Sequence, residues 1–219
     1  MSDGRLFEDR QDAGRQLAER LEPYRDEEPI VLGLPRGGVV LGYEIARALD
    51  APLDVVVARK VGAPGHEELG IGAVAPGVTL ADERALYALD IDRETFEALA
   101  AEARREMDRR LLLYRGEAGL PDVAGKTAIL VDDGLATGVT ATAAAHALRR
   151  MKPRRLVLAV AVCARETAAA IRALVDDLVC LAIPDAFVAV GLWYRDFRQI
   201  TDEEVLDLLE KARASADAD

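Results

Sequence analysis

Two adjacent carboxylates followed by a loop of glycines and threonines form the stretch of this sequence best suited to chemistry, from Val131 to Thr140. A glycine loop with hydroxyl side chains, followed by a helix from about Val139, presents backbone N–H groups to an anion such as phosphate. Carboxylates cannot bind phosphate themselves, but they suit sugar hydroxyls or a divalent cation. We therefore expect a sugar phosphate here. The candidate binding residues are Asp132, Asp133, Gly134, Leu135, Ala136, Thr137, Gly138, Val139 and Thr140.

Two better known phosphate loops do not fit this stretch. A Walker A loop needs a lysine after its last glycine, and no lysine occurs between Lys126 and Lys152. The Gly-x-Gly-x-x-Gly pattern of dinucleotide-binding proteins is absent as well. An ordinary strand-to-helix turn is the bland alternative, although two neighbouring acids in such a turn repel each other and lose solvation.

Cations and glycines follow two other strand-like runs. Arg36, Gly37 and Gly38 come after the apolar run Ile30–Leu34, and a guanidinium beside exposed amides suits phosphate oxygens. Arg59 and Lys60 follow the run 53–58, where the carboxyl end of a parallel strand would present them to an anionic ligand. The alternatives are a glycine turn with a solvated arginine and cations that only extend into solvent.

Strand-like runs alternate with helical patterns along the chain, which predicts an α/β fold with a doubly wound, Rossmann-like parallel sheet and ligands at the carboxyl ends of its strands. Glycine-rich residues 61–80 read as a loop that ends in a short hairpin, at 70–75 and 78–80. Residues 83–121 read as a helical insertion with Asp92 as an N-cap. The expected helices are 9–22, 39–49, 92–115, 139–150, 164–175 and 201–213, and the expected strands are 30–34, 53–58, 129–131, 155–162 and 178–183.

The composition of the chain excludes some classes of protein. The chain has 219 residues, a size typical of one domain, and no apolar run long enough to span a membrane. A net charge of −11 argues against a nucleic-acid-binding protein, which usually has a basic surface. The two cysteines, Cys163 and Cys180, are too few for a disulfide framework and indicate a reducing cytoplasm.

Aromatic side chains gather near the end of the chain, after the last expected strand. Phe187, Trp193 and Tyr194 could stack on a planar base, or they could form a small packing cluster.

The stretch Val131-Asp-Asp-Gly-Leu-Ala-Thr-Gly-Val-Thr140 resembles the signature that binds phosphoribosyl pyrophosphate (PRPP) in type I phosphoribosyltransferases, in the variant of the adenine and xanthine enzymes. The resemblance implies one phosphoribosyltransferase domain over residues 1–219, with a mobile loop at about 61–80 and a hood at about 183–200. It implies that Mg²⁺ is held mainly through PRPP, with Asp132 and Asp133 as candidate protein ligands. The family is commonly dimeric or tetrameric, so we expect a homo-oligomer.

The resemblance also assigns roles to particular residues. Residues 33–38 correspond to the pyrophosphate loop, where a non-proline cis peptide is often found, and Arg36, Gly37 and Lys60 would meet the pyrophosphate. The general base of adenine-type enzymes is a glutamate of the mobile loop, which points to Glu67 or Glu68, although both could be solvated charges. Val188 pairs with Phe187 as in the purine-reading hood, but Trp193 is not typical of that pattern.

The resemblance implies a transferase that moves the phosphoribosyl group of PRPP to a nitrogen acceptor, a nucleobase, as in purine salvage. A PRPP or nucleotide sensor without transfer activity is the alternative, and a hydrolase that uses water as acceptor is a third. Retention of Arg36–Gly38 and Lys60 favours an enzyme, because binding a ribose phosphate alone does not require them. The sequence leaves the acceptor open.

Overall fold

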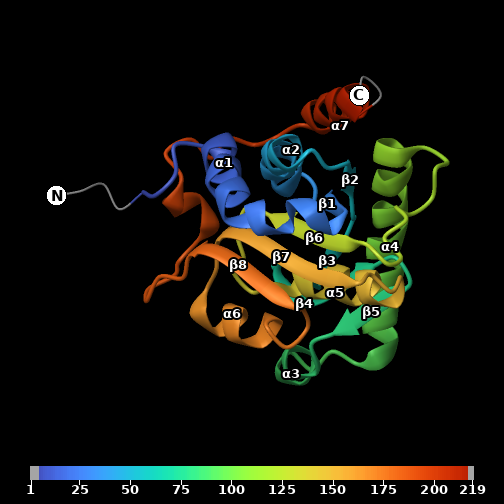
Figure 1. Cartoon of the computed structure of the whole chain (residues 1–219). Helices are drawn as coiled ribbons and strands as arrows, with labels where there is room; N and C mark the ends of the chain where they lie inside the picture. The colour runs from blue at the N-terminus through green and yellow to red at the C-terminus, as the bar shows by residue number, and fades with distance from the viewer. Residues whose placement is uncertain (1–4, 217–219) are drawn as a thin grey trace.

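A computed structural model of the chain describes residues 5–216 and, within them, every side chain except those of Glu68 and Ala216. Five parallel strands form the main sheet: β1 (Pro29–Gly33), β2 (Leu53–Val55), β6 (Thr127–Asp132), β7 (Arg155–Val162) and β8 (Asp177–Ala182). Their order across the sheet is β2-β1-β6-β7-β8 (Figure 1). The chain therefore winds outward in two directions from β1 and β6, and the topological switch point lies between these two strands.

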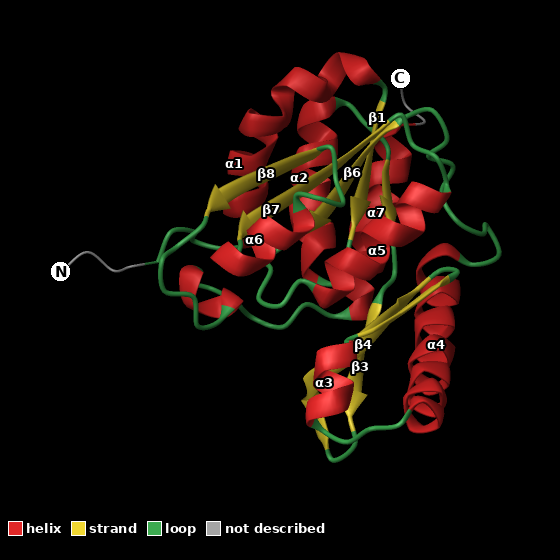
Figure 2. Cartoon of the chain, turned by 90° about the horizontal axis from the view of Figure 1, so that it is seen from below, coloured by secondary structure: helices red, strands yellow, loops and turns green. Residues whose placement is uncertain are grey.

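Helices cover both faces of this sheet, which confirms the doubly wound prediction (Figures 1 and 2). One face carries α1 (Arg10–Leu21), α2 (Gly37–Leu49) and α7 (Asp202–Ala216), and the other carries α5 (Val139–Arg150) and α6 (Arg165–Ile171). Alternate residues of β6 enter the two cores: Ile129 lies with α1 and α2, and Leu130 lies with α5. Two short 3-10 helices complete this part of the chain, η1 (Glu22–Glu27) and η2 (Val190–Trp193).

The second strand is shorter than expected. Residues 53–58 form a continuous apolar run, yet β2 ends at Val55, because its partner β1 ends at Gly33, opposite Val55. Val56 and Val57 are still buried, as a connector between two sheets. Arg59 and Lys60 are consequently not at the end of a parallel strand, and this prediction was wrong.

A separate antiparallel sheet occupies most of the segment that we expected to be a loop. It consists of β3 (Arg59–Ala63), β4 (His66–Ala75) and β5 (Val78–Ala81), in the order β3-β4-β5. The hairpin of β4 and β5 confirms the one expected near 70–80, but the preceding residues pair as well. Small side chains of β4 and β5 pack on α5, which fixes this sheet against the helix that follows the phosphate loop. The packed residues are Ala73, Ala75, Val78, Ala143 and Ala147.

The helical insertion consists of α3 (Glu83–Ala88) and α4 (Arg93–Arg115), and Asp92 caps α4 by accepting a 2.7 Å hydrogen bond from the Thr95 amide. The first half of α4 packs on the small sheet, where the Phe96 ring lies over Gly72. Its last turn contacts β2 and α7. Arg115 donates to both oxygens of Asp54 at 2.7 and 2.8 Å, and the Tyr114 hydroxyl donates to Asp202. The insertion therefore joins the small sheet to the edge of the main sheet.

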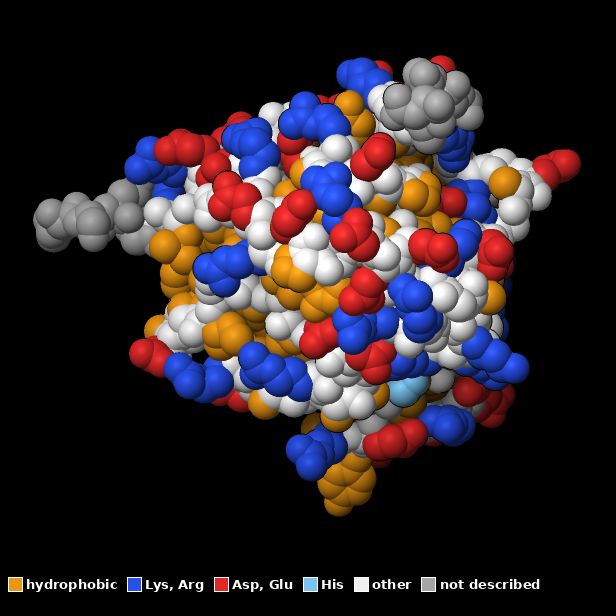
Figure 3. Space-filling view, in the orientation of Figure 1, with side chains coloured by type: hydrophobic (Ala, Val, Ile, Leu, Met, Phe, Trp, Pro, Cys, Tyr) orange, Lys and Arg blue, Asp and Glu red, His pale blue; other side chains and the backbone are white. Residues whose placement is uncertain are grey.

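The surface shows charges of both signs close together. Acidic and basic side chains alternate over the face seen in Figure 3, without a large area of one sign. No helix within residues 5–216 is both long enough and apolar enough to cross a lipid bilayer.

Candidate functional site

The switch point brings the two predicted ligand loops together. Gly33 at the end of β1 pairs with Val131 at the end of β6, so both loops leave the same edge of the sheet. A Cβ atom on Gly38 would lie 2.3 Å from the Val131 carbonyl oxygen, and one on Gly37 would lie 2.0 Å from Asp133 Oδ2. Glycine is therefore required at both positions for the loops to touch. The peptide bond between Pro35 and Arg36 is cis, as the resemblance led us to expect for this loop.

Arg36 lies half-buried in this loop, and within residues 5–216 its side chain has no hydrogen bond or ion pair. Together with Arg10 and Arg198 it lines a cavity of about 300 Å³ beside Gly37. An anion in this cavity would meet guanidinium groups that match phosphate oxygens in geometry.

The loop that follows Asp133 is anchored on the neighbouring strand and leaves its tip open. The Leu135 amide donates to the Val162 carbonyl oxygen at 2.9 Å, and the Leu135 oxygen accepts from the Ala164 amide at 2.9 Å. Ala136 and Thr137 are exposed, and Gly138 has a φ of 68° where α5 begins. The N–H groups in the first turn of a helix have no partner within the helix, so this end of α5 can accept a phosphate.

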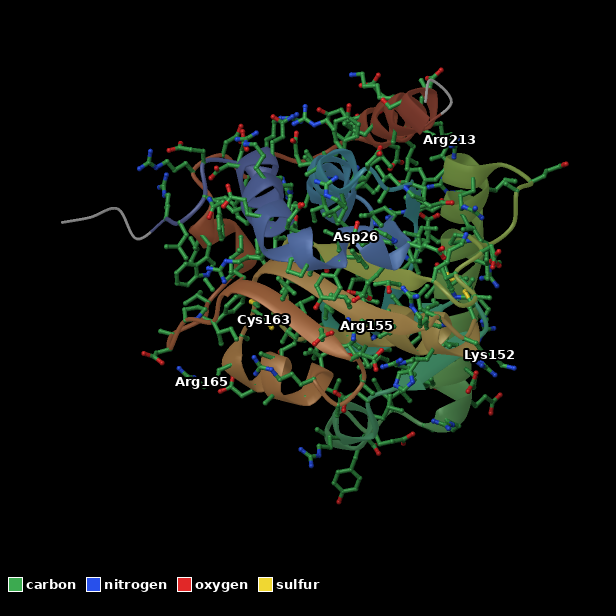
Figure 4. The ribbon with its side chains drawn as sticks, viewed as in Figure 1. Asp26, Lys152, Arg155, Cys163, Arg165 and Arg213 are labelled. Atoms are coloured by element: carbon green, nitrogen blue, oxygen red, sulfur yellow. The ribbon has the colours of Figure 1, made fainter. Side chains whose placement is uncertain are left out.

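The carboxyl end of β7 lies at the same edge of the sheet as the two ligand loops. Figure 4 shows Arg155 and Cys163 toward opposite ends of β7, with Cys163 on the side of the hood. Cys163 is buried and Cys180 is half-buried, and both are free thiols. Burial raises the pKa of both thiols, to about 12 and about 11, so neither is a ready nucleophile.

The two predicted carboxylates differ in their surroundings. Asp133 is paired with Arg10, whose Nε donates to Asp133 Oδ2 at 2.7 Å, and the exposed fractions of the two side chains are 15% and 10%. Asp132 has no ion pair within residues 5–216, and its Oδ1 accepts from the Asp133 amide at 2.9 Å. Burial raises the pKa of both carboxyls; the charge of Asp133 adds to the rise at Asp132, and the Arg10 guanidinium opposes the rise at Asp133.

Arg10 was missed by the sequence analysis. It lies in the first turn of an amphipathic helix, where a charged residue normally faces solvent. Its side chain is instead buried: Nη1 donates to the Arg198 carbonyl oxygen at 2.8 Å, and the guanidinium stacks on the Phe197 ring at 3.8 Å. Nothing local in the sequence signals these contacts, because both partners lie close to the other end of the chain.

The hood does not bring the four predicted base-binding residues together. Tyr194 is only 2% exposed; its ring packs against Phe7 and Phe197, and its hydroxyl donates to the Asp133 carbonyl oxygen at 2.6 Å. Burial is the main cause that raises its pKa, so this hydroxyl stays a donor. Tyr194 holds the backbone at Asp133 from within the core. Its prediction as a base-stacking residue was therefore wrong.

The other hood residues have different environments. Val188 is 80% exposed, whereas Phe187 and Trp193 are half-buried and pack against the core. The side chain that reaches the phosphate motif is Val190, because a Cβ on Gly134 would lie 2.5 Å from Val190 Cγ1. A valine among other small apolar residues gives no sequence signal of this contact.

Lys60 borders the phosphate loop although its strand differs from the one expected. Its aliphatic stem lies over Gly70: a Cβ built there would be 3.1 Å from Lys60 Cδ and 3.9 Å from Val139 Cγ1. The lysine thus lies near the start of α5. Arg59 turns toward the insertion, where its Nη1 is 3.9 Å from Glu106 Oε1.

Glu106 of α4 gathers three arginines. Besides Arg59 it accepts from Arg109 at 2.8 Å and from Arg110 at 2.9 Å. The hydrogen bond from Arg109 is the main cause that lowers the pKa of Glu106 to about 2. The insertion therefore fixes the position of Arg59, one of the predicted ligand-binding residues.

Glu67 and His66 lie on β4, next to the turn at Pro64 and Gly65, and both are exposed. Glu68 lies on the same strand, but its side chain is outside the described part of the structure. The carboxylate of Glu67 therefore faces solvent near the tip of the β3–β4 hairpin.

The donor set fits a magnesium ion held mainly by its substrate. Within residues 5–216, no three His, Cys, Asp or Glu side chains gather as a metal site. Asp132 and Asp133 offer carboxylate oxygens, which Mg²⁺ prefers, and substrate phosphates and water would supply the remaining ligands.

Comparisons with known proteins agree with this geometry. Residues 7–197 match the family described as "Phosphoribosyl transferase domain". A provisionally named phosphoribosyl transferase of Mycobacterium tuberculosis is 41% identical over 209 residues, which are 95% of this chain and 47% of that protein. The chain thus spans about half the length of the curated relatives that it matches.

Solved structures extend the comparison. The TT1426 protein from Thermus thermophilus has a TM-score of 0.78 and 42% identity, and the match covers 94% of this chain and 98% of that one. A purine phosphoribosyltransferase from Pyrococcus horikoshii has a TM-score of 0.50 and 17% identity, with coverage of 90% and 99%, and this likeness shows the fold alone.

Proposed function

Because the chain belongs to the phosphoribosyl transferase domain family, we propose that it transfers the phosphoribosyl group of PRPP to a nitrogen of a nucleobase and releases pyrophosphate. One observation carries the proposal: the carboxylates of Asp132 and Asp133 lie beside the Arg36–Gly38 loop at the switch point of the sheet. A ligand with a sugar between two phosphate groups matches this arrangement, because one loop can accept each group.

In this proposal the 5′-phosphate of PRPP binds in the loop 134–140, at the N-terminus of α5. The ribose hydroxyls donate to the carboxylate pair. The pyrophosphate lies against Arg36, Gly37 and Gly38, with Lys60 approaching from the small sheet. Mg²⁺, when bound, offsets the charge of the pyrophosphate.

The acceptor nitrogen forms a bond to the anomeric carbon as the bond from that carbon to the pyrophosphate oxygen breaks, and the pyrophosphate leaves with the bonding pair. The protein contributes positioning and stabilisation of the developing negative charge. Glu67 or Glu68 takes the proton of the acceptor nitrogen once the β3–β4 hairpin lies over the substrate.

The proposal is tested by measuring pyrophosphate release from PRPP and Mg²⁺ with a panel of purine and pyrimidine bases. We expect release that depends on one base, and its loss in an Asp132→Asn variant. No release with any base, while calorimetry shows that the wild type binds PRPP, would contradict a nucleobase transferase and favour a PRPP sensor.

A further inference from the structure

Helix α6 contacts the phosphate loop, residues 134–140, at two points, and both contacts are made by Thr167. The Thr167 hydroxyl donates a hydrogen bond to the Ala136 carbonyl oxygen. Its methyl group lies against Gly138, since a Cβ atom built on that glycine would be 2.4 Å from Thr167 Cγ2. One side chain of α6 therefore contacts the loop on both sides of Thr137.

The position of α6 is fixed by the core on the α5 side of the main sheet. Ala168 and Ile171 are each 1% exposed and belong to the buried cluster on that side. The helix begins directly after Ala164, whose amide donates to the Leu135 carbonyl oxygen at 2.9 Å. Thr167 thus contacts the loop from an element that is anchored next to it.

The hydrogen bond from Thr167 fixes the direction of one peptide group of the loop. The peptide bond between Ala136 and Thr137 is trans, so its C=O and its N–H point in opposite directions. Because Thr167 holds the carbonyl oxygen, the Thr137 N–H points away from α6. Within residues 5–216 the amides of Ala136, Thr137 and Gly138 donate to no acceptor. These consecutive N–H groups, just before α5, are donors that the loop can offer to a phosphate.

A reversal of this peptide group would weaken an anion site. It would turn the Ala136 carbonyl oxygen, which carries a partial negative charge, to the side where the Thr137 N–H now lies. Ala136 and Thr137 are exposed, so water can satisfy the carbonyl oxygen in either orientation. The Thr167 hydroxyl, in contrast, binds that oxygen in one orientation only. Donors that are already oriented toward a ligand do not have to be reorganised when it binds.

We propose that Thr167 is a positioning residue for the phosphate loop: its hydroxyl holds the Ala136–Thr137 peptide in the orientation in which the loop accepts the 5′-phosphate of the substrate. This inference rests on the proposed function. Thr167 acts through the backbone of the loop and not by a contact of its own with the phosphate. Affinity for the ribose 5-phosphate half of PRPP is therefore determined in part by α6, outside the 131–140 motif.

Two substitutions separate the two contacts of Thr167. Thr167→Val removes the hydroxyl and keeps a methyl group against Gly138, whereas Thr167→Ser keeps the hydroxyl and removes the methyl group. Thr79→Val is the matched control, because it removes an exposed hydroxyl of β5 that accepts from Arg104 at 3.0 Å. Calorimetry would compare two ligands for each variant: ribose 5-phosphate, and pyrophosphate with Mg²⁺, which is the half of PRPP assigned to the Arg36–Gly38 loop.

We expect Thr167→Val to weaken the binding of ribose 5-phosphate about tenfold and that of pyrophosphate by less than about twofold. Thr167→Ser should bind both ligands with nearly the wild-type affinity, because the hydroxyl is retained. The Thr79→Val variant should match the wild type. A general loss of packing or a partly unfolded sample would affect both ligands alike, so neither imitates this pattern.

Wild-type affinity for ribose 5-phosphate in Thr167→Val would overturn the inference and leave the proposed function intact. An equal loss in Thr167→Ser would overturn it as well, because the effect would then belong to the methyl contact. A loss of pyrophosphate affinity as large as that of ribose 5-phosphate would have the same consequence. A wild type that binds neither ligand would overturn the proposed function, and this inference with it.

Discussion

Side by side at the end of β6, Asp132 and Asp133 put two negative charges into a half-buried site, and only Asp133 has a cationic partner within residues 5–216. Repulsion and lost solvation make such a pair unfavourable in the ligand-free protein. A binding site often retains groups that reduce stability, because the ligand needs them. The stability of the folded chain should therefore increase more when Asp132 is neutralised than when Asp133 is.

We predict that Asp132→Asn raises the melting temperature of the ligand-free protein at pH 7. Burial, and then the charge of Asp133, raise the pKa of Asp132 well above its usual range. The folded state therefore holds this proton more tightly than the unfolded state, and the wild type loses stability as the pH rises from about 4 through the raised value. Each kcal/mol of unfolding free energy gained with the neutral amide should raise the melting temperature by about 2–4 °C, measured by differential scanning calorimetry.

The same calorimetry repeated at a series of pH values supplies the control for this prediction. The gain should shrink as the pH falls toward about 4, where the wild-type carboxyl is itself protonated. Asp133→Asn should raise the melting temperature less than Asp132→Asn does, because burial raises the pKa of the Asp133 carboxyl as well but the neutral amide leaves the buried Arg10 without its anionic partner. A lower melting temperature for Asp132→Asn at pH 7 would contradict this account of the pair.

A second prediction at this scale concerns Tyr194. Tyr194→Phe removes the hydroxyl that donates to the Asp133 carbonyl oxygen and keeps the ring between Phe7 and Phe197. We expect a loss of about 0.5–1.5 kcal/mol of unfolding free energy in urea titrations. The KM for the acceptor base should stay near the wild-type value, and a large rise in that KM would restore Tyr194 as a base-contacting residue.

Among the elements, α4 does the most to fix the small sheet, and the sequence revealed only part of this. Its cap at Asp92 and its extent over residues 92–115 were predicted correctly, because both follow from local patterns. Its partners could not be predicted, since the Arg115–Asp54 pair joins residues 61 positions apart in sequence. A charged face on a long helix looks the same whether it meets solvent or another element.

Glycines explain why the small sheet was taken for a loop. Glycine usually interrupts strands, so residues 61–80 predict a loop. Here the glycines permit close packing: a Cβ on Gly62 would lie 2.5 Å from the Glu67 carbonyl oxygen, and one on Gly72 would lie 2.3 Å from the Leu80 carbonyl oxygen and 2.8 Å from the Phe96 ring. Only the contacts between elements show this use of glycine, and a single sequence does not contain them.

We predict that Arg115→Met loosens the small sheet. The guanidinium is 8% exposed and binds both oxygens of Asp54, so its removal leaves a partly buried carboxylate without its partner and should cost about 3 kcal/mol. Hydrogen exchange should show faster exchange of the β3 and β4 amides, with β6 and β7 less affected.

Arg93→Met is the matched control on the same helix. Its ion pair with Glu83 is exposed, at 64% and 74%, and exposed pairs contribute little. This variant should exchange like the wild type. Equal exchange in both variants would show that α4 does not fix the sheet through its last turn.

For the whole molecule, the sequence predicted the fold class because alternating apolar runs and helical patterns are sufficient to indicate a parallel sheet. It also predicted that the Asp132–Asp133 stretch and the Arg36–Gly38 loop lie at the ends of buried strands, since both follow apolar runs. Their adjacency required the strand order, in which β6 pairs with β1 although about a hundred residues separate them. The homo-oligomer and the cytoplasmic location stay predictions.

The measurement that tests the central claim most directly is the ratio of nucleotide formed to pyrophosphate released, in one reaction with PRPP, Mg²⁺ and the base that supports release. Transfer of the phosphoribosyl group predicts one nucleotide for each pyrophosphate, detected together by mass spectrometry and a pyrophosphate assay. Pyrophosphate without nucleotide would mean that water is the acceptor, and the chain would be a hydrolase on this fold.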